Sequence, residues 1–232
     1  MYTQFVKLYD YIFPIQKNAL NFLIKYLPKE KVLDIGCGTG SMASELANNG
    51  YFVTGMDINQ EMINEANKKS NKGNPRFISK GMLEVEEEDF FDGAYCIGNT
   101  LVHLSSLDEV KLFLEKVKKA IKKNGIFLIQ IINYDRIINQ KITFLPTIKN
   151  EFVEMKRNYF LKENKVRFQT IIQVPNQDVI TDEVELLALR QQELLSIVQK
   201  VGWNIVSITD GFNEKEMTEE SYSFVLVLKR EV

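Results

Sequence analysis

The sequence predicts an α/β protein built on a doubly wound parallel sheet, and three observations support this fold class. Apolar segments of strand length alternate with amphipathic helical segments between residues 30 and 133. The first of these strands runs directly into a turn that holds three glycines. After residue 133 the alternation stops, and strand-like stretches follow one another as in antiparallel hairpins. We therefore expect an α/β core that is interrupted by an inserted antiparallel β subdomain.

The N-terminal segment is predicted to form two short helices. Apolar residues recur at helical intervals over residues 3–27, and Pro14 interrupts the pattern. Proline lacks the amide hydrogen that a helix interior needs, so it separates the two helices. Residues 1–29 are therefore expected to form a helical cap on the core.

The opening strand and its turn are the most informative stretch of the chain. Residues 32–35 read Val-Leu-Asp-Ile, which suits a strand buried on both faces. Gly36, Gly38 and Gly40 allow the tight turn that follows, because glycine adopts positive φ without steric cost. A helical segment begins at once, so a ligand in the turn would lie against the amide groups of its first residues. Asp34 would point toward the same place from the end of the strand.

The later elements follow from the same patterns. Asn124 and Gly125 are expected to end the long helix before the fifth strand. Residues 162–165 would form the turn of a hairpin in the insert. Residues 90–104 are predicted to hold the fourth strand and the turn after it. The other predicted strands are 51–57, 76–79, 126–132, 151–160, 166–174, 182–188, 203–209 and 222–228, and the predicted helices begin at residues 41, 58, 107 and 191.

The glycine-rich run resembles a known family. The pattern Asp34-x-Gly36-x-Gly38-x-Gly40 is similar to the first motif of the class I S-adenosylmethionine (SAM) dependent methyltransferases. A dinucleotide-binding loop, as in an NAD-dependent oxidoreductase, would instead need a glycine at position 41, where the chain has serine. The octapeptide 97–104, Ile-Gly-Asn-Thr-Leu-Val-His-Leu, resembles the corresponding segment of glycine and sarcosine N-methyltransferases.

The resemblance implies a Rossmann-like, doubly wound seven-stranded sheet whose last strand is antiparallel. Residues 30–133 and 190–232 would form the SAM-binding core, and residues 134–189 would form an inserted β subdomain on the substrate side. The match is good over residues 30–132 and loose over residues 190–230, and it does not identify the insert.

Asp57, at the end of the second strand, is placed to accept hydrogen bonds from two ribose hydroxyls. It could also cap the next helix. The resemblance implies that Asp34 lies near the amino group of SAM and that a tyrosine of the N-terminal segment, Tyr9 or Tyr11, folds over the cofactor as a lid. Family members often carry an acid at this point that contacts the adenine amino group. This chain has Met82 and Leu83 there instead, so only apolar packing on the adenine is expected. The cofactor-binding residues implied are Tyr9, Asp34, Gly36, Cys37, Gly38, Gly40, Asp57, Ile58, Met82 and Leu83.

The resemblance implies in-line transfer of the SAM methyl group to a small-molecule acceptor, most simply an amine. Asn99 would face the sulfonium, and His103, the only histidine, is the candidate base for another acceptor. Arg136, Arg190 and Tyr11 are the candidate substrate-binding residues. Packing or surface roles remain open for these residues. The alternative function is a SAM-binding regulator, or another binder with the methyltransferase fold that transfers nothing.

Composition limits the partners and the compartment. The net charge is −2 and no basic stripe is present, which argues against nucleic acid as a partner. Cys37 and Cys96 show neither a disulfide framework nor metal-ligand spacing. No signal peptide or membrane-spanning run is evident. We expect a cytoplasmic protein that acts on a small molecule, without a metal, a nucleic acid or a membrane.

Overall fold

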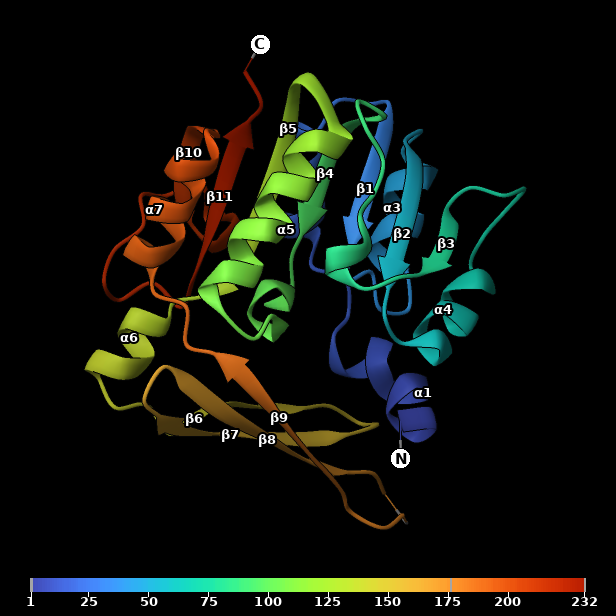
Figure 1. The fold of residues 1–232 in the computed structure, drawn as a ribbon. Helices are drawn as coiled ribbons and strands as arrows, with labels where there is room; N and C mark the ends of the chain where they lie inside the picture. Colours follow the sequence, from blue (N-terminus) through green and yellow to red (C-terminus); the bar gives the residue numbers. More distant parts are fainter. Residues whose placement is uncertain (1, 176, 232) are drawn as a thin grey trace.

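The apolar strands of the core pair in parallel to form most of a seven-stranded sheet (Figure 1). The structure, a computed structural model, describes residues 2–175 and 177–231. The order of the strands is β10-β11-β5-β4-β1-β2-β3. β11 runs antiparallel to β10 and to β5, and the other pairs are parallel, which confirms the expected doubly wound sheet with an antiparallel last strand. The strands are β1 (Lys31–Ile35), β2 (Phe52–Asp57), β3 (Arg76–Ser79), β4 (Phe91–Cys96), β5 (Ile121–Ile132), β10 (Asn204–Asp210) and β11 (Ser223–Lys229).

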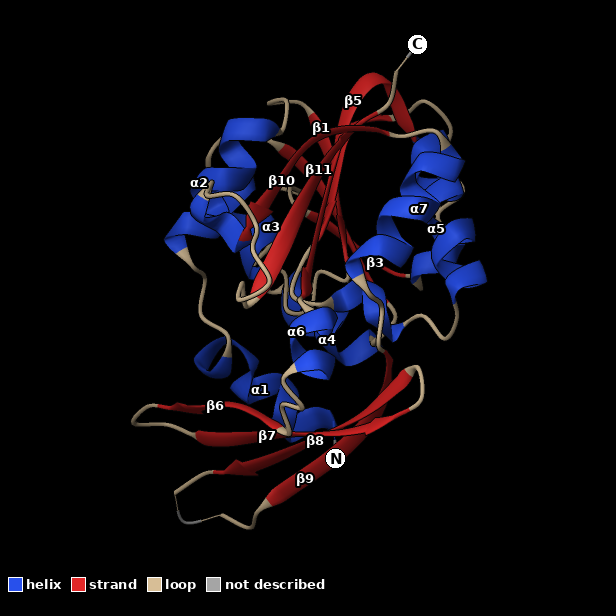
Figure 2. Ribbon diagram, turned by 90° about the vertical axis from the view of Figure 1, so that its left-hand side faces the viewer, coloured by secondary structure: helices blue, strands red, loops and turns tan. Residues whose placement is uncertain are grey.

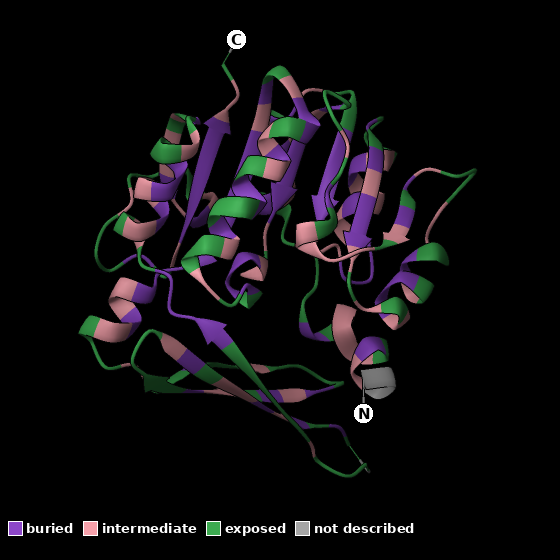
Figure 3. Ribbon diagram, viewed as in Figure 1, coloured by how far each residue is buried: buried purple, intermediate pink, exposed green. Residues whose placement is uncertain are grey.

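Helices cover both faces of this sheet (Figure 2). On one face α2, α3 and α4 bury residues such as Phe22, Leu46 and Ile63. On the other face α5 and α7 bury Phe113 and Leu194. The strands between them are buried while the outer faces of the helices are exposed, so the sheet is the middle of three layers (Figure 3). These helices are α2 (Lys17–Tyr26), α3 (Ser41–Asn48), α4 (Gln60–Asn67), α5 (Leu107–Ala120) and α7 (Gln191–Val201).

A second sheet lies across the edge at which the parallel strands end (Figure 1). Its four strands are antiparallel in the order β6-β7-β8-β9. The first helix, α1 (Tyr2–Ile12), lies between this sheet and the core, and Ile12 packs with Met155 and Ile172 of the second sheet. The elements of the insert are α6 (Tyr134–Asn139), β6 (Phe144–Lys149), β7 (Glu154–Lys162), β8 (Lys165–Gln173) and β9 (Ile180–Leu187).

Three local expectations were inexact. The long helix ends at Ala120, so Asn124 and Gly125 do not terminate it. Instead they lie in the irregular start of β5, where Asn124 has a φ of 65° and the pairing with β4 shifts. α4 begins at Gln60 rather than at residue 58, because the side chain of Asn59 caps it. The structure also adds α6 and β6, which the sequence patterns did not indicate.

Among the residues that the structure describes, none of the helices combines the length and the apolarity needed to cross a membrane.

Candidate active site

The glycine-rich turn joins β1 to α3, and all three of its glycines have positive φ. The values are 74° for Gly36, 54° for Gly38 and 74° for Gly40. Gly38 also permits a close approach, because a Cβ placed there would lie only 3.1 Å from the Cε1 atom of Tyr9. At Gly36 a Cβ would collide with the side chain of Thr100, which comes from the segment after β4. The turn therefore needs glycine for its backbone shape and for its neighbours.

Asp57 holds the turn from the end of the neighbouring strand β2. Its Oδ2 atom accepts a hydrogen bond from the amide of Gly38 at 2.9 Å, and its Oδ1 atom accepts one from the amide of Asn59 at 2.9 Å. Asn59, rather than Asp57, caps α4, because its Oδ1 atom accepts from the amide of Glu61 at 2.9 Å. The carboxylate of Asp57 thus lies beside the turn, where a ligand in the turn could reach it.

Asp34 is buried at the start of the turn and lacks a full set of partners. It lies beside Tyr95 of β4 in the strand register, and only 2% of its surface is exposed. The hydroxyl group of Tyr95 interacts with this carboxyl group, but the two do not meet in hydrogen-bond geometry, so Asp34 Oδ2 has no hydrogen-bond partner in the described chain. Burial raises the pKa of Asp34 to about 7, and the nearby Asp57 carboxylate adds to this while Tyr95 opposes it. Such a carboxyl group is suited to a cationic ligand.

The residues that the sequence predicts near the adenine, Ile58, Met82 and Leu83, lie close to Asp57. Ile58 is 78% exposed, and its Cδ1 atom would lie 3.5 Å from a Cβ on Gly81. Met82 and Leu83 follow in the short 3₁₀ helix Met82–Glu84 and are half-buried against the core. An exposed isoleucine directly after a carboxylate that could bind ribose fits contact with a flat apolar group such as adenine.

Helix α1 carries Tyr9 over the turn and is held there by polar contacts. Desolvation, together with the carboxylates of Asp57 and Asp34, raises the pKa of Tyr9 well above its ordinary value. The next residue, Asp10, accepts hydrogen bonds from Thr39 Oγ1 at 2.6 Å and from Ser41 Oγ at 2.8 Å. Asp10 also forms an ion pair with Lys69, two residues after α4, at 2.5 Å. We call these three side-chain contacts of Asp10 the α1 latch.

Tyr11 lies on a different side of the same helix. Its ring packs against Phe152 of the insert with 4.4 Å between ring centroids, and its carbonyl accepts a hydrogen bond from Asn150 Nδ2 at 2.7 Å. The structure therefore places Tyr11 at the junction of α1 with the insert, apart from the glycine-rich turn.

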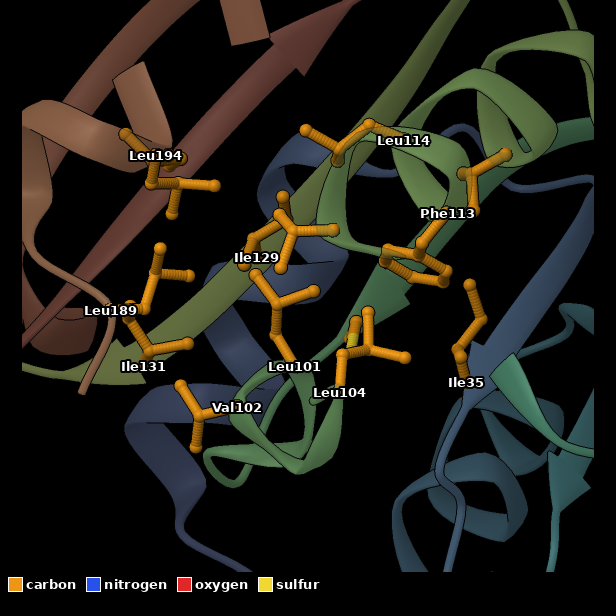
Figure 4. Packing of buried hydrophobic residues seen from close by; sticks show 14 of the residues in the cluster. Ile35, Leu101, Val102, Leu104, Phe113, Leu114, Ile129, Ile131, Leu189 and Leu194 are labelled. Carbon is orange, nitrogen blue, oxygen red and sulfur yellow. The ribbon is translucent and has the colours of Figure 1, made fainter. Parts of the chain in front are cut away.

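Asn99 sits at the carboxyl end of β4 in a left-handed conformation with a φ of 66°. Its Oδ1 atom accepts from the amide of Ile132 at 3.0 Å, and its Nδ2 atom donates to the hydroxyl of Tyr134 at 3.1 Å. The buried Leu101 and Leu104 anchor the segment that follows it (Figure 4). The amide orientation of Asn99 is thus fixed from two sides.

Two tyrosines that the sequence patterns did not single out complete this region. Tyr134 begins α6, Tyr159 lies on β7, and both are buried. Their hydroxyl groups interact, and burial raises the pKa of Tyr134 to about 12. His103, at the end of the 3₁₀ helix Thr100–His103, is exposed, and partial desolvation lowers its pKa. No periodicity links Tyr134 to Tyr159, so only the fold brings them together.

The two arginines proposed for the substrate differ in their surroundings. Arg190 precedes α7, its side chain is 47% exposed, and its Nη1 atom lies 3.7 Å from Asp135 Oδ1. Arg136, on α6, is half-buried, and its Nε atom is buried without a hydrogen-bond partner. Arg190 therefore already has a carboxylate partner, whereas the side chain of Arg136 has none among the described residues.

These features fit SAM. The turn, the carboxylate of Asp57 and the exposed Ile58 follow one another along the carboxyl ends of β1 and β2, and the buried carboxyl of Asp34 has an unpartnered oxygen. These groups together match the parts of a ligand in which an adenosine carries a cationic amino acid. Ligands bind at this edge in sheets of this type.

Comparisons with known proteins agree with this reading. Residues 32–125 match the methyltransferase domain family. The chain is 24% identical to the glycine/sarcosine N-methyltransferase of Aphanothece halophytica over 221 residues, covering 90% of this chain and 81% of the relative. A SAM-dependent methyltransferase structure from Clostridium acetobutylicum superimposes with a TM-score of 0.86 at 20% identity, covering 100% of this chain and 99% of the other. The CcbJ methyltransferase of Streptomyces caelestis gives a TM-score of 0.81 at 18% identity, covering 93% and 89%. The methyltransferase domain over residues 32–125, the curated relatives and the shared fold together support a SAM-dependent methyltransferase, as the glycine-rich motif indicated.

Proposed function

We propose that the protein transfers the methyl group of SAM to the nitrogen of a small-molecule amine. The side chains at the carboxyl ends of β4 and β5 carry this proposal. Asn99, Tyr134 and Tyr159 offer neutral hydrogen-bonding groups there, and the pKa of Tyr134, about 12, keeps its phenol protonated at neutral pH. An amine brings its own lone pair and needs no strong base, whereas a hydroxyl acceptor usually needs one. The region therefore suits nitrogen better than oxygen.

In this proposal the residues of the chain mainly bind and orient the reactants. SAM supplies a methyl group that is already activated on its sulfonium. The turn at 36–40 lies against the amino-acid part of SAM, Asp57 accepts from the ribose hydroxyls, and Asp34 faces the amino group. Asn99 Oδ1 has a second lone pair that can accept a hydrogen bond from the N–H of the amine. This bond would orient the lone pair of the amine nitrogen toward the methyl group. Holding the reactants in line can remove about 7–11 kcal/mol of the barrier.

The insert completes the site in this proposal. Residues 1–29 act as the cap, residues 30–133 and 190–232 as the SAM-binding core, and residues 134–189 supply the acceptor side. The position of the second sheet across the carboxyl ends of the parallel strands supports this division (Figure 1). The relative from Aphanothece halophytica is named as an enzyme that methylates the nitrogen of glycine and sarcosine, which supports an amine acceptor.

The test is methyl transfer from isotopically labelled SAM into separate pools of small amines, phenols and alcohols, with products identified by mass spectrometry. We expect N-methylated products, with a rate that rises with pH as the amine loses its proton. His103→Gln should leave kcat unchanged, because an amine needs no external base. Labelled O-methyl products alone, lost in His103→Gln, would overturn the proposal. SAM binding without transfer into any pool would favour the regulator.

A further inference from the structure

Two arginines of the described chain bury a guanidinium nitrogen that has no hydrogen-bond partner. They are Arg136 on α6 and Arg157 on β7, and in each the buried atom is Nε. By contrast, Arg167, Arg190 and Arg230 each pair with a carboxylate. Guanidinium groups stay charged at all accessible pH values, and a buried charge is normally paired. Neither Arg136 nor Arg157 has a carboxylate partner among the described residues, so an anionic ligand would supply the missing countercharge.

Arg157 lies on the inner face of the second sheet, between two buried neighbours. Side chains alternate along a strand, so Met155, Arg157 and Tyr159 share one face of β7. Met155 packs with Ile12 of α1, and Tyr159 interacts with Tyr134, the partner of Asn99. Arg157 thus lies between α1, which carries Tyr9, and the residues at the carboxyl ends of β4 and β5.

Buried residues of the two neighbouring strands flank Arg157. Arg157 is paired with Leu145 on β6 and with Thr170 on β8, and both of these are buried. Its Nη2 atom donates to the carbonyl of Pro146 at 2.5 Å, which fixes the plane of the guanidinium. The chain itself covers Nε, so the hydrogens available to a ligand are those of Nη1 and the second hydrogen of Nη2, on a side chain that is already oriented.

Arg136 is less well placed for the same task. Tyr134 and Ile137 form the buried face of α6, and Arg136 is about 200° around the helix from Tyr134. Its side chain therefore leaves the helix on the side opposite to Asn99. Arg190 is exposed and paired with Asp135.

We propose that Arg157 determines substrate specificity by binding the carboxylate of an amino-acid-like acceptor. This inference rests on the proposed function and names its substrate class: a small amine that also carries a carboxylate. The planar fork of a guanidinium matches a carboxylate with two parallel hydrogen bonds. With the carboxylate at Arg157, the amino group of the same molecule extends toward Asn99, which accepts its N–H.

The first experiment measures binding without any methyl transfer. Protein saturated with S-adenosylhomocysteine is titrated with acetate and with acetamide, which has the same shape without the charge, and binding is followed by NMR. Wild type should bind acetate at least tenfold more tightly than acetamide, and Arg157→Met should lose this preference. Lys156→Met is the matched control, because Lys156 is the next residue on β7, exposed on the outer face. Equal binding of the two probes by wild type, or an unchanged preference in Arg157→Met, would overturn the proposal.

The second experiment measures transfer with glycine and with glycinamide. Wild type should favour glycine by about 10²-fold in kcat/KM, and Arg157→Met should abolish the preference while the Kd for SAM stays within twofold. Arg157→Lys should restore part of it, since the charge returns without the fork. Methylation of glycinamide as fast as glycine by wild type would contradict the carboxylate assignment while leaving N-methyl transfer intact. If no amine is methylated, the proposed function fails, and the acetate titration still decides the role of Arg157.

Discussion

The ring of Tyr9 lies directly over Gly38, so that a Cβ on the glycine would be 3.1 Å from Cε1 and 3.2 Å from the hydroxyl oxygen of the tyrosine. A segment near the N-terminus thus lies against the middle glycine of the SAM motif. Any side chain at position 38 must displace either this ring or a ligand in the turn.

Gly38→Val should therefore abolish SAM binding while leaving most of the sheet folded. The substitution strains a backbone with a φ of 54°, at about 1–2 kcal/mol, and also places a branched side chain against Tyr9. Gly73→Val is the matched control, since Gly73 has a φ of 79° and nothing lies within 4 Å of its Cβ position. Calorimetry with SAM and circular dichroism on both variants separate strain from contact. Similar affinities in the two variants would show that the contact does not matter.

Asp57→Ala should weaken SAM binding by about tenfold or more, because charge-assisted hydrogen bonds contribute about 1.5–3 kcal/mol each and water replaces them only in part. The variant also removes the acceptor for the amide of Gly38, so the turn itself should loosen. Asp89→Ala serves as the control, because Asp89 lies before β4, at the other end of the strand from Asn99, in a surface ion pair with Arg230. An unchanged Kd for SAM in a folded Asp57→Ala protein would remove Asp57 from the ribose.

The local sequence was sufficient to predict the structure of the part of the site that lies on one contiguous motif. The run from Asp34 to Gly40 fixes a strand, a turn and a helix start, and the structure has all three. It was not sufficient for β6, because Pro146 removes an amide hydrogen from the middle of that strand. The structure tolerates the proline because β6 is an edge strand. Helix α6 has only six residues, too few to show a period.

The acceptor side could not be predicted for a related reason. Asn99 comes from the segment after β4, Tyr134 from α6 and Tyr159 from β7, and only the return of the insert over the sheet brings them together. The orientation of Arg157 depends on which face of β7 is turned inward, and this follows from the packing of Met155 against Ile12. Pairings between distant segments leave no periodicity in the sequence.

The buried carboxyl of Asp34 should make the stability of the free protein depend on pH. Its pKa in the folded state is about 7, above the ordinary value of 3.8, so the folded protein holds a proton that the unfolded chain releases. The free energy of unfolding should therefore fall as the pH rises from 4 to 7. Asp34→Asn should unfold at a higher temperature than wild type at pH 8, and the difference should shrink toward pH 5. Thermal unfolding at several pH values checks this, and a difference that does not vary with pH would contradict it.

The same group should make SAM binding depend on pH in the opposite sense. A cation next to Asp34 favours the ionised carboxylate, so the Kd for SAM should fall by up to about tenfold between pH 6 and pH 8. Asp34→Asn should lose this dependence. Tyr95→Phe should shift the change in Kd to higher pH, because Tyr95 holds the pKa of Asp34 down. Calorimetric titrations of the three proteins at matched ionic strength provide the measurement.

The α1 latch should control how fast SAM enters and leaves. Burial raises the pKa of Asp10, but hydrogen bonds from Lys69, Thr39 and Ser41 outweigh this effect and hold the pKa below its ordinary value. The stabilisation that Asp10 provides is therefore complete above about pH 4 and is lost only as the pH falls through the lowered pKa. The latch is closed throughout the neutral range, with Tyr9 over the turn that we propose for SAM.

Asp10→Ala should therefore raise both the association and the dissociation rate constants for SAM, each by about threefold or more, because α1 no longer has to break three polar contacts before Tyr9 can move. The Kd should change less than either rate constant, since the latch slows entry and exit together. Surface plasmon resonance at pH 7.5 measures both rate constants. Lys7→Met is the control on the same helix, because Lys7 is exposed and lies outside the latch. If Asp10→Ala and Lys7→Met both bind and release SAM at the wild-type rates, α1 does not have to open for SAM to reach the turn.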